Sequence, residues 1–588
     1  MCLWNGASKF LPLFVPYLST SCPLITYPRM ARHATDLPEL RQHFARYLDL
    51  DSLKACSLVC KAWHLDFHSV LWRHFCYKVP KNLSESAEEL SRWLDIASRK
   101  AYLFRHVYHK ESRRAMVPEI SDILLERCHG LITIEAFIAR VKGGDPVRYW
   151  EETLRPLVEQ NKVSIQRLLL REVIPTPMIS FHMPSLLSGL PRLQSLELGM
   201  VTTLEDLLQV LDACSTSLKC FDLLSSIRRR NADQESSAPD QQKSPSQSIV
   251  HQAATTIAPP LRLKRLGILG GCYNGTLWDI LSHIAAHYLE SLQVNAIIDT
   301  PFAFQVSPTL RDKLSRLTDL HVKNRQPKDD PLFPVLLAAI PLQQLRNLHM
   351  GAMDVECTTM LIDRHHQSLE TLTVHFVQSH AGALGDILAT CSKLKSLDFG
   401  TEPFVDIRTL IDPQKPWVCT ELEVFEGIFG LSPCPSPLAS NENNGAEDSK
   451  QEDEGGDGKV TTFDPVTSDL VESLFMQRVG RLTKLRRFMH RFDIMGRLFS
   501  DYTGDEGKDV MAWTLFSGLT HLADLVNLEW LEFLDGDLPE GISIPELVFF
   551  KQHWTSLRGL ACYNMDAVEV KEWLATEWPE LQVVLNHT

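Results

Sequence analysis

A short apolar motif that returns throughout most of the chain constrains its fold more than any other feature. The motif reads x-Leu-x-x-Leu-x-Leu, with conservative replacements, and runs from about residue 130 to the C-terminus. Clear copies are RLQSLEL (192–198), RLKRLGI (262–268), YLESLQV (288–294), RLTDLHV (316–322), QLRNLHM (344–350), SLETLTV (368–374), KLKSLDF (393–399) and NLEWLEF (527–533). Looser copies begin at Gly130, Ser164, Ser217, Glu421, Lys484, Ser556 and Glu580. Neighbouring copies mostly start 24–29 residues apart, which predicts a stack of similar structural units.

Each unit is expected to hold one strand followed by one helix. Amphipathic helix patterns lie between the motifs, for example at Leu204–Ser215 and Leu277–Leu289. The period and the motif resemble those of leucine-rich repeats, and the resemblance implies an α/β solenoid with parallel strands on the concave side and helices on the convex side. The ninth motif position holds Val201, Gly271, Ile297 and Arg325 in four copies. The Asn or Cys ladder that is usual there is therefore missing.

Two polar inserts interrupt the period. The stretch 228–252 is rich in Ser, Gln and Asp, and Glu442–Asp457 holds seven acids and one Lys. Such compositions bury too little apolar surface to pack. We therefore expect loops without fixed structure at about 225–260 and 432–463, extruded from a repeat array that spans 130–588.

Composition excludes some functions. A net charge of −14 argues against nonspecific nucleic-acid binding, which needs a basic surface. The 14 Cys are scattered along the chain without the spacing of a disulfide framework, and Cys214, Cys391 and Cys562 occupy positions that suit small core residues. Reduced thiols predict a cytoplasmic or nuclear protein. We find no phosphate-binding loop, HExxH motif or local catalytic Cys signature, so we expect neither an enzyme nor a cofactor.

The first 35 residues are expected to be an unstructured leader. Phe10–Leu18 is apolar and follows Lys9, as in a weak signal peptide. Two prolines interrupt it, and it is far too short to span a bilayer, so we expect no membrane association. Translation from Met30 would omit it.

Residues 36–76 have a helical pattern. Asp36 suits the N-cap of a first helix, with Pro38 in its opening turn, and Leu40, Phe44, Tyr47 and Leu48 recur at helical spacing. We expect a second helix capped by Asp51. Its apolar stripe would comprise Leu53, Cys56, Leu58, Val59 and Trp63. Residues 77–129 are expected to form a mostly helical bridge into the repeats.

The stretch Leu37–Phe75 resembles an F-box, the helical module that binds a Skp-type adaptor in cullin-based ubiquitin ligases. The family pattern matches Leu37-Pro38, Leu48–Asp51 with Leu53, Leu58-Val59-Cys60 with Trp63, and Leu71-Trp72, while LPEL is one residue shorter than usual. The resemblance implies Trp63 as an internal anchor and these adaptor contacts: Leu37, Pro38, Leu53, Leu58, Val59 and Trp72.

Two other clusters have competing interpretations. Cys56, Cys60, His64 and His68 are four residues apart, but ligands on one straight helix cannot surround a tetrahedral zinc ion, so we expect no metal site. A basic cluster could bind an acidic or phosphorylated segment, or could be a solvated face that pairs with the acidic insert. Its members are Arg478, Arg481, Lys484, Arg486, Arg487 and Arg491.

Strand residues that alternate with the buried leucines are expected on the concave face, which is the natural binding surface. The favoured target contacts are Asp319, His321, His349, Thr373, His375, Trp530 and Glu532, with Trp530 as a candidate aromatic anchor. Further positions on the same face are Lys323, Asn347, Thr371, Ser396, Asp398 and Leu534.

The sequence thus predicts a substrate-recognition subunit of a Skp–cullin–F-box ubiquitin ligase. It would bind the adaptor, and through it a cullin, at one end and an unknown protein target on the repeats. The alternative is a repeat scaffold that binds proteins without joining a ligase. A Cys-dependent ligase with its own thioester is a third hypothesis.

Overall fold

A computed structural model of the chain forms two compact units, Met1–Phe75 and Cys76–Thr588. The described residues are 38–45, 47–48, 50–77, 87–109, 118–138, 146–172, 177–199, 201, 203–214, 216–226, 260–270, 274–295, 308–323, 332–353, 355–377, 382–400, 405–412, 414–430, 468–490, 515, 518–533, 542–562 and 568–584. The expected leader, Asp36, Leu37, Arg491, Leu534 and most of both inserts lie outside these ranges.

Among its described residues the first unit holds three helices, α1 (Pro38–Ala45), α2 (Leu50–Ser57) and α3 (Lys61–Leu71). Their small core consists of Ala45, Leu53, Phe67 and Val70, against which Trp63 packs as predicted. Arg41 on α1 and Asp66 on α3 form an ion pair of 2.6 Å in which both side chains are largely buried. Strand β1 (His74–Tyr77) follows α3 across the boundary between the units.

The predicted second helix is wrong in its extent. We expected one apolar stripe from Leu53 to Trp63, but α2 ends at Ser57 and α3 starts after Cys60, whose backbone is extended. Leu58 and Val59 therefore lie in the turn between the two helices and are exposed. Asp51 falls inside α2 and not at its N-cap, because α2 begins at Leu50, two residues earlier than a helix capped by Asp51 would.

The second unit is a parallel-strand solenoid. Every predicted motif copy forms a strand. With the first leucine counted as position 1, the strand begins at position 3. In the last copy it begins at position 2. With the additional strand β2, the strands are β2 (His106–His109), β3 (Thr133–Ile138), β4 (Arg167–Glu172), β5 (Ser195–Leu198), β6 (Cys220–Leu223), β7 (Arg265–Ile268), β8 (Ser291–Asn295), β9 (Asp319–Lys323), β10 (Asn347–Met353), β11 (Thr371–Val377), β12 (Ser396–Asp398), β14 (Val424–Gly427), β16 (Arg487–His490), β17 (Trp530–Phe533), β18 (Gly559–Cys562) and β19 (Gln582–Val584). From β2 onward each of these pairs in parallel with the next. A separate short pair joins β13 (Val405–Asp406) to β15 (Phe429–Gly430).

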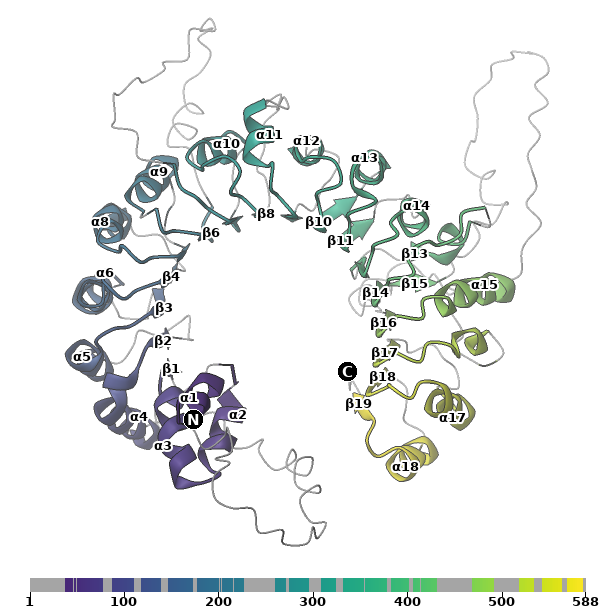
Figure 1. Cartoon of the computed structure of the whole chain (residues 1–588), viewed down its shortest axis with the longest axis horizontal. Coiled ribbons are helices and arrows are strands. Elements are labelled where there is room, and N and C mark those ends of the chain that lie inside the picture. The colour runs from purple at the N-terminus through teal and green to yellow at the C-terminus, as the bar shows by residue number, and fades with distance from the viewer. Residues whose placement is uncertain are drawn as a thin grey trace, which may run out of the picture. The chain divides into compact units, whose positions relative to one another are not determined.

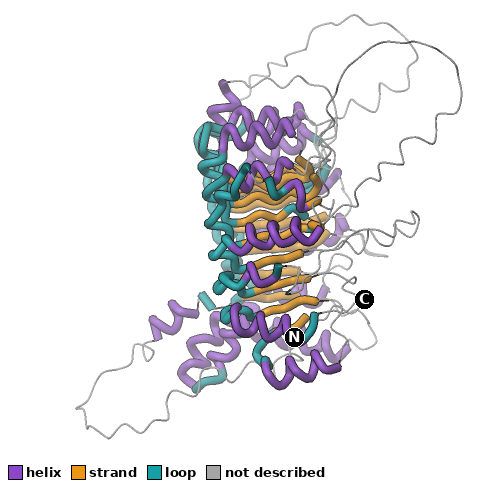
Figure 2. Tube along the Cα trace, turned by 90° about the vertical axis from the view of Figure 1, so that its right-hand side faces the viewer, coloured by secondary structure: helices purple, strands orange, loops and turns teal. Residues whose placement is uncertain are grey.

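Helices cover one side of the sheet. They are α4 (Ala87–Lys100), α5 (Pro118–Arg127), α6 (Pro146–Tyr149), α7 (Arg155–Gln160), α8 (Pro177–Ser188), α9 (Leu204–Ala213), α10 (Asn274–Ser282), α11 (Pro308–Lys313), α12 (Leu332–Ala339), α13 (Val355–His365), α14 (Gly382–Thr390), α15 (Ser468–Gly480), α17 (Ile544–His553) and α18 (Val568–Glu577). In this unit the strands line the inner side and the helices the outer side (Figure 1), and the tube view shows the strands stacked in succession (Figure 2). The predicted α/β solenoid is confirmed.

The sheet starts earlier than we expected. Strand β2 lies within the stretch 77–129, where we expected a helical bridge, and pairs in parallel with β3. Its sequence, His106–His109, has no leucine motif, so the strand pattern could not reveal it. Helices α4 and α5 on either side of β2 are the helical part of that prediction.

The motif leucines form the core between strands and helices. In the copy at β11, Leu369, Leu372 and Val374 are completely buried, and each such side chain contributes about 1.5–3 kcal/mol through removal from water. Cys214 and Cys391 are also buried, and burial raises the pKa of their thiols to about 12 and about 11. They are free thiols, as predicted, whereas the side chain of Cys562 is not described.

Side-chain hydrogen bonds join neighbouring units at a motif position other than the ninth, where the usual Asn or Cys ladder is missing. The residue before the first motif leucine donates a side-chain hydrogen bond to the carbonyl of the first leucine in the preceding copy. Four such bonds are Ser164 to Leu131 (2.8 Å), Ser217 to Leu193 (2.8 Å), Gln344 to Leu317 (3.0 Å) and Ser368 to Leu345 (2.7 Å). Because each bond joins neighbouring units, these bonds help to fix their spacing.

We expect His365 to make the stability of the solenoid depend on pH. Its imidazole is completely buried in the last turn of α13, and burial, with a smaller effect of Arg364, lowers its pKa from 6.5 to about 4. Above pH 6.5 the ring is neutral in both states. Below it the unfolded chain takes up the proton first, so the free energy of unfolding falls by roughly 3 kcal/mol between pH 6.5 and 4.

We expect His365→Leu to remove this part of the pH dependence, as measured by urea unfolding at pH 7.0 and 5.0. His366→Gln is the control, because the adjacent ring is only half-buried and its Nδ1 lies 2.8 Å from the Ile362 carbonyl. Equal losses of stability on acidification in wild type and His365→Leu would contradict this role.

Candidate functional site

The inner face of the sheet is the candidate binding surface. Motif positions 3 and 5 point away from the leucine core, and in β6, β8 and β9 these positions are half-buried while positions 4 and 6 are buried. The parallel register aligns them from strand to strand. His321 lies beside His349, and His349 beside Thr373. The face therefore carries two continuous rows of side chains, one for each position.

The centre of this face, on β9 to β12, brings most of the predicted contacts together. Asp319, Asn347, Thr371 and Ser396 follow one another in the position-3 row, and His321, His349, Thr373 and Asp398 in the position-5 row. The rings of His321 and His349 are only 3.9 Å apart between centroids. Asn347 donates a hydrogen bond to Asp319, which also accepts one from Thr318 at 2.6 Å. This sector offers hydroxyl, amide and imidazole groups and two carboxylates.

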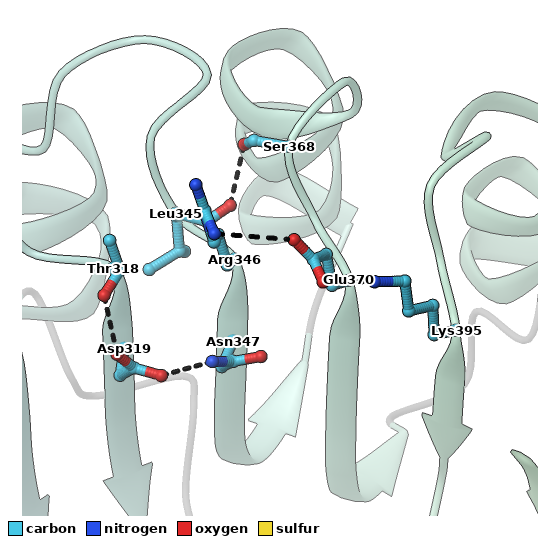
Figure 3. A network of polar contacts seen from close by, with 8 residues as sticks. All are labelled: Thr318, Asp319, Leu345, Arg346, Asn347, Ser368, Glu370 and Lys395. Carbon is cyan, nitrogen blue, oxygen red and sulfur yellow. Dashed lines mark hydrogen bonds and ion pairs between the residues drawn. The ribbon is translucent and has the colours of Figure 1, made fainter.

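Figure 3 shows this network together with a charged ladder at motif position 2. Glu370 lies between two cations, 2.7 Å from Lys395 and 3.9 Å from Arg346. The Lys395 hydrogen bond holds the pKa of Glu370 below its usual value. Arg346 and Lys395 are exposed and Glu370 is half-buried, so each pair adds little to stability. They lie along the edge of the central sector, and their opposite charges compensate one another.

The sector on β3 to β7 consists of carboxylates held by arginines. Arg171 lies 3.3 Å from Glu135 and 2.5 Å from Glu197. Arg265 lies 3.4 Å from Asp222, a carboxyl whose burial raises its pKa. The pattern of leucines does not predict these pairs. Only the register between strands shows that Glu or Asp on one strand lies near Arg on the next.

The sector on β16 to β18 carries the predicted aromatic anchor. Trp530 is half-buried, and its indole lies over Gly559 on the next strand, since a Cβ built there would be 1.9 Å from the ring. The indole Nε1 donates to Glu532 at 3.4 Å. Trp530 and Glu532 are thus in contact, but they lie several strands away from the central sector. His375 is on β11, with a side chain that is not described.

Gly559→Ala is expected to displace the Trp530 ring. The added methyl group overlaps the ring, and such overpacking costs about 1–3 kcal/mol. The matched control is Gly382→Ala, because nothing lies within 4 Å of a Cβ built at Gly382. Urea unfolding measures both variants. Equal stabilities for the two would contradict the close contact between Gly559 and Trp530.

The helical unit exposes a second candidate surface. Leu58 and Val59 are 83% and 62% exposed, and three further apolar side chains, Phe44, Tyr47 and Leu65, are also exposed. Phe44 and Tyr47, whose helical spacing indicated an apolar face, thus lie in solvent. Several large exposed apolar groups in so small a unit are typical of a protein contact surface.

The remaining predicted adaptor contacts have different surroundings. Pro38 is exposed at the start of α1. Trp72 is half-buried, and its indole N–H donates to His68 Nε2 at 2.8 Å. Leu53 is 3% exposed in the core, so in this conformation it stabilises the unit and has almost no surface to offer a partner.

The structure divides the cluster of Cys and His between two helices, and contacts within the chain engage four members of the basic cluster. Cys56 lies on α2, whereas His64 and His68 lie on α3, and no group of three or more possible metal ligands occurs among the described residues. In the basic cluster, Lys484 pairs with Glu421, Arg486 with Glu529 and Arg487 with Glu426. Arg478 donates to the carbonyls of Lys415 and Asp412. The acids come from neighbouring copies of the motif.

Within the described ranges, every helix is too short or too polar to pass through a bilayer. No protein-family model matches the chain, and neither does any curated protein. A similar solved structure is the leucine-rich repeat-containing protein LegL7 from Legionella pneumophila, with 13% identity, 45% of this chain and 89% of that chain covered, and a TM-score of 0.27. The fold assignment rests on the strand register and core of the chain itself.

Proposed function

We propose that this chain is the substrate-recognition subunit of a Skp–cullin–F-box ubiquitin ligase. The helical unit binds the adaptor, and the inner face of the solenoid binds the target protein. The chain performs no bond-making step itself. It raises the local concentration of the target's lysines near a conjugating enzyme that the ligase holds.

One observation carries the proposal: the turn between α2 and α3 leaves Leu58 and Val59 in solvent. These two residues belong to the Leu-Val-Cys segment through which the stretch resembles an F-box. A unit of this size gains little by exposing such side chains unless a partner covers them. Phe44, Tyr47 and Leu65 extend the exposed apolar set. Pro38 and Trp72 remain proposed contacts, and Leu53 is assigned to the core.

The solenoid supports the second half of the proposal. Its inner face presents aligned polar rows and the aromatic side chain of Trp530 on a scaffold whose leucines are buried. Repeat arrays commonly use such extended inner surfaces to bind other proteins.

Co-purification tests the proposed function. Purified full-length chain is mixed with a purified Skp-type adaptor, and the complex is measured by size-exclusion chromatography with light scattering. A stoichiometric complex is expected. Absence of a complex at micromolar concentrations, with the chain folded by circular dichroism, would instead favour a scaffold that joins no ligase.

A further inference from the structure

Carboxylates recur along the position-5 row of the inner face. From β3 to β18, six strands place an acid in this row and none places Lys or Arg there. The acids are Glu135, Glu197, Asp222, Asp398, Glu426 and Glu532. A carboxylate that is partly or fully removed from water favours a cation beside it.

For four of these acids the chain itself supplies the cation, and it is always an arginine. Arg171 serves Glu135 and Glu197, Arg265 serves Asp222, and Arg487 serves Glu426 at 3.5 Å. Each arginine stands on a strand next to its acid. At four positions of the row, the cation beside the carboxylate is therefore a guanidinium group.

Glu532 differs from these four. Its neighbours across the row are Met489 on β16 and Ala561 on β18, and no ion pair joins it to any described residue. The Trp530 indole donates to it over a long 3.4 Å. Arg487, which lies beside Trp530 in the register, points its guanidinium to Glu426 and to the Met489 sulfur at 3.3 Å.

Gly559 allows the Trp530 indole to approach the neighbouring strand closely. Because Gly559 has no side chain, the Trp530 ring lies down over its backbone. A flat aromatic surface beside a carboxylate matches the guanidinium group, which stacks on the ring and donates hydrogen bonds to the carboxylate in the same plane. An ammonium group is compact and strongly hydrated, and so fits such a site less well.

We propose that Trp530 and Glu532, with Gly559 beneath the indole, form a binding site for an arginine side chain of the target protein. The proposal rests on the proposed function in one respect, namely that the inner face binds a protein partner. It names the chemistry that this partner must present: an arginine on a segment that reaches β17.

The test uses full-length chain labelled with 5-fluorotryptophan and observed by fluorine NMR. The chain has 12 Trp, and the resonance of Trp530 is the one that Trp530→Phe removes. The probes are blocked Gly-Arg-Gly, Gly-Lys-Gly and Gly-citrulline-Gly peptides. We expect Gly-Arg-Gly to shift the Trp530 resonance in a saturable manner, the lysine peptide to bind more weakly, and the uncharged citrulline peptide to have no comparable effect.

Glu532→Gln is expected to weaken Gly-Arg-Gly binding about tenfold, because the charge-assisted hydrogen bonds are lost. Glu529→Gln is the matched control, since Glu529 is on the segment that leads into β17 and already pairs with Arg486 at 2.6 Å. This variant should bind like wild type. Equal responses to the arginine and citrulline peptides, or unchanged binding by Glu532→Gln, would overturn the arginine site.

Adaptor binding by the same protein samples separates the two proposals. A chain that binds the adaptor but shows no arginine-specific shift overturns the arginine site alone. A chain that shows the arginine-specific shift but binds no adaptor supports the site and overturns the ligase role.

Discussion

Changing both Leu58 and Val59 to aspartate is expected to abolish binding of the Skp-type adaptor without lowering the stability of the free chain. The two side chains are 83% and 62% exposed, so the folded unit loses almost no packing. In the complex, however, each leucine or valine that leaves water contributes about 1.5–3 kcal/mol. A buried aspartate without a partner adds a further cost. Together these effects predict a loss in affinity of at least about a thousandfold.

The matched control places the same substitutions on apolar residues that are exposed in the solenoid. Val163→Asp with Leu470→Asp changes side chains that are 64% and 51% exposed. This variant should bind the adaptor like wild type. The affinities are measured by isothermal titration and the melting curves by circular dichroism. If the Leu58/Val59 variant binds within about threefold of wild type, which is less than 1 kcal/mol, the turn between α2 and α3 is not the docking surface.

Replacing Phe425 by alanine is expected to cost the solenoid about 3–5 kcal/mol, which is the range for truncating a fully buried phenylalanine. Phe425 is completely buried on β14. Its ring lies 5.8 Å from those of Phe399 and Phe488, which belong to the preceding and following copies of the motif. Trp417 and Phe475 complete the cluster at 5.9 Å and 6.4 Å.

The position of Phe425 predicts how the variant unfolds. In a repeat array each unit is stabilised mainly by its neighbours, and this cluster joins the motif copies of β12, β14 and β16 with α15. Loss of the ring should therefore split one melting transition into two, as measured by differential scanning calorimetry. Phe425→Leu, which keeps most of the apolar volume, should cost only about 1 kcal/mol and keep a single transition. A single transition in Phe425→Ala, shifted as little as in Phe425→Leu, would show that the cluster does not couple the units.

The repeat architecture was predictable because one periodic signal determines both strand position and burial. The motif places a leucine at positions 1, 4 and 6, and the alternation of a strand then assigns positions 3 and 5 to the inner face. Asp319, His321, His349 and Thr373 consequently lie in aligned rows, as their spacing indicated. Such a prediction needs no knowledge of long-range contacts.

Features that depend on the register between units were not predictable in this way. The pairs of Arg171 with Glu135 and Glu197 join three successive strands, and the hydrogen bonds at the start of each motif reach a carbonyl one copy away. Strand β2 forms by pairing with β3 although its own sequence carries no leucine motif. In the helical unit, an apolar stripe at helical spacing continued through Leu58 and Val59, but the chain turns there and exposes both.

Reconstitution with a cullin tests most directly whether this chain links a ligase to a target. An immobilised cullin is incubated with purified full-length chain, in the presence and in the absence of the Skp-type adaptor, and the retained chain is quantified. We expect retention only with the adaptor, and loss of that retention in the Leu58→Asp/Val59→Asp variant but not in Val163→Asp/Leu470→Asp. Equal amounts of wild-type chain retained with and without the adaptor, or none retained in either case, would contradict the ligase role.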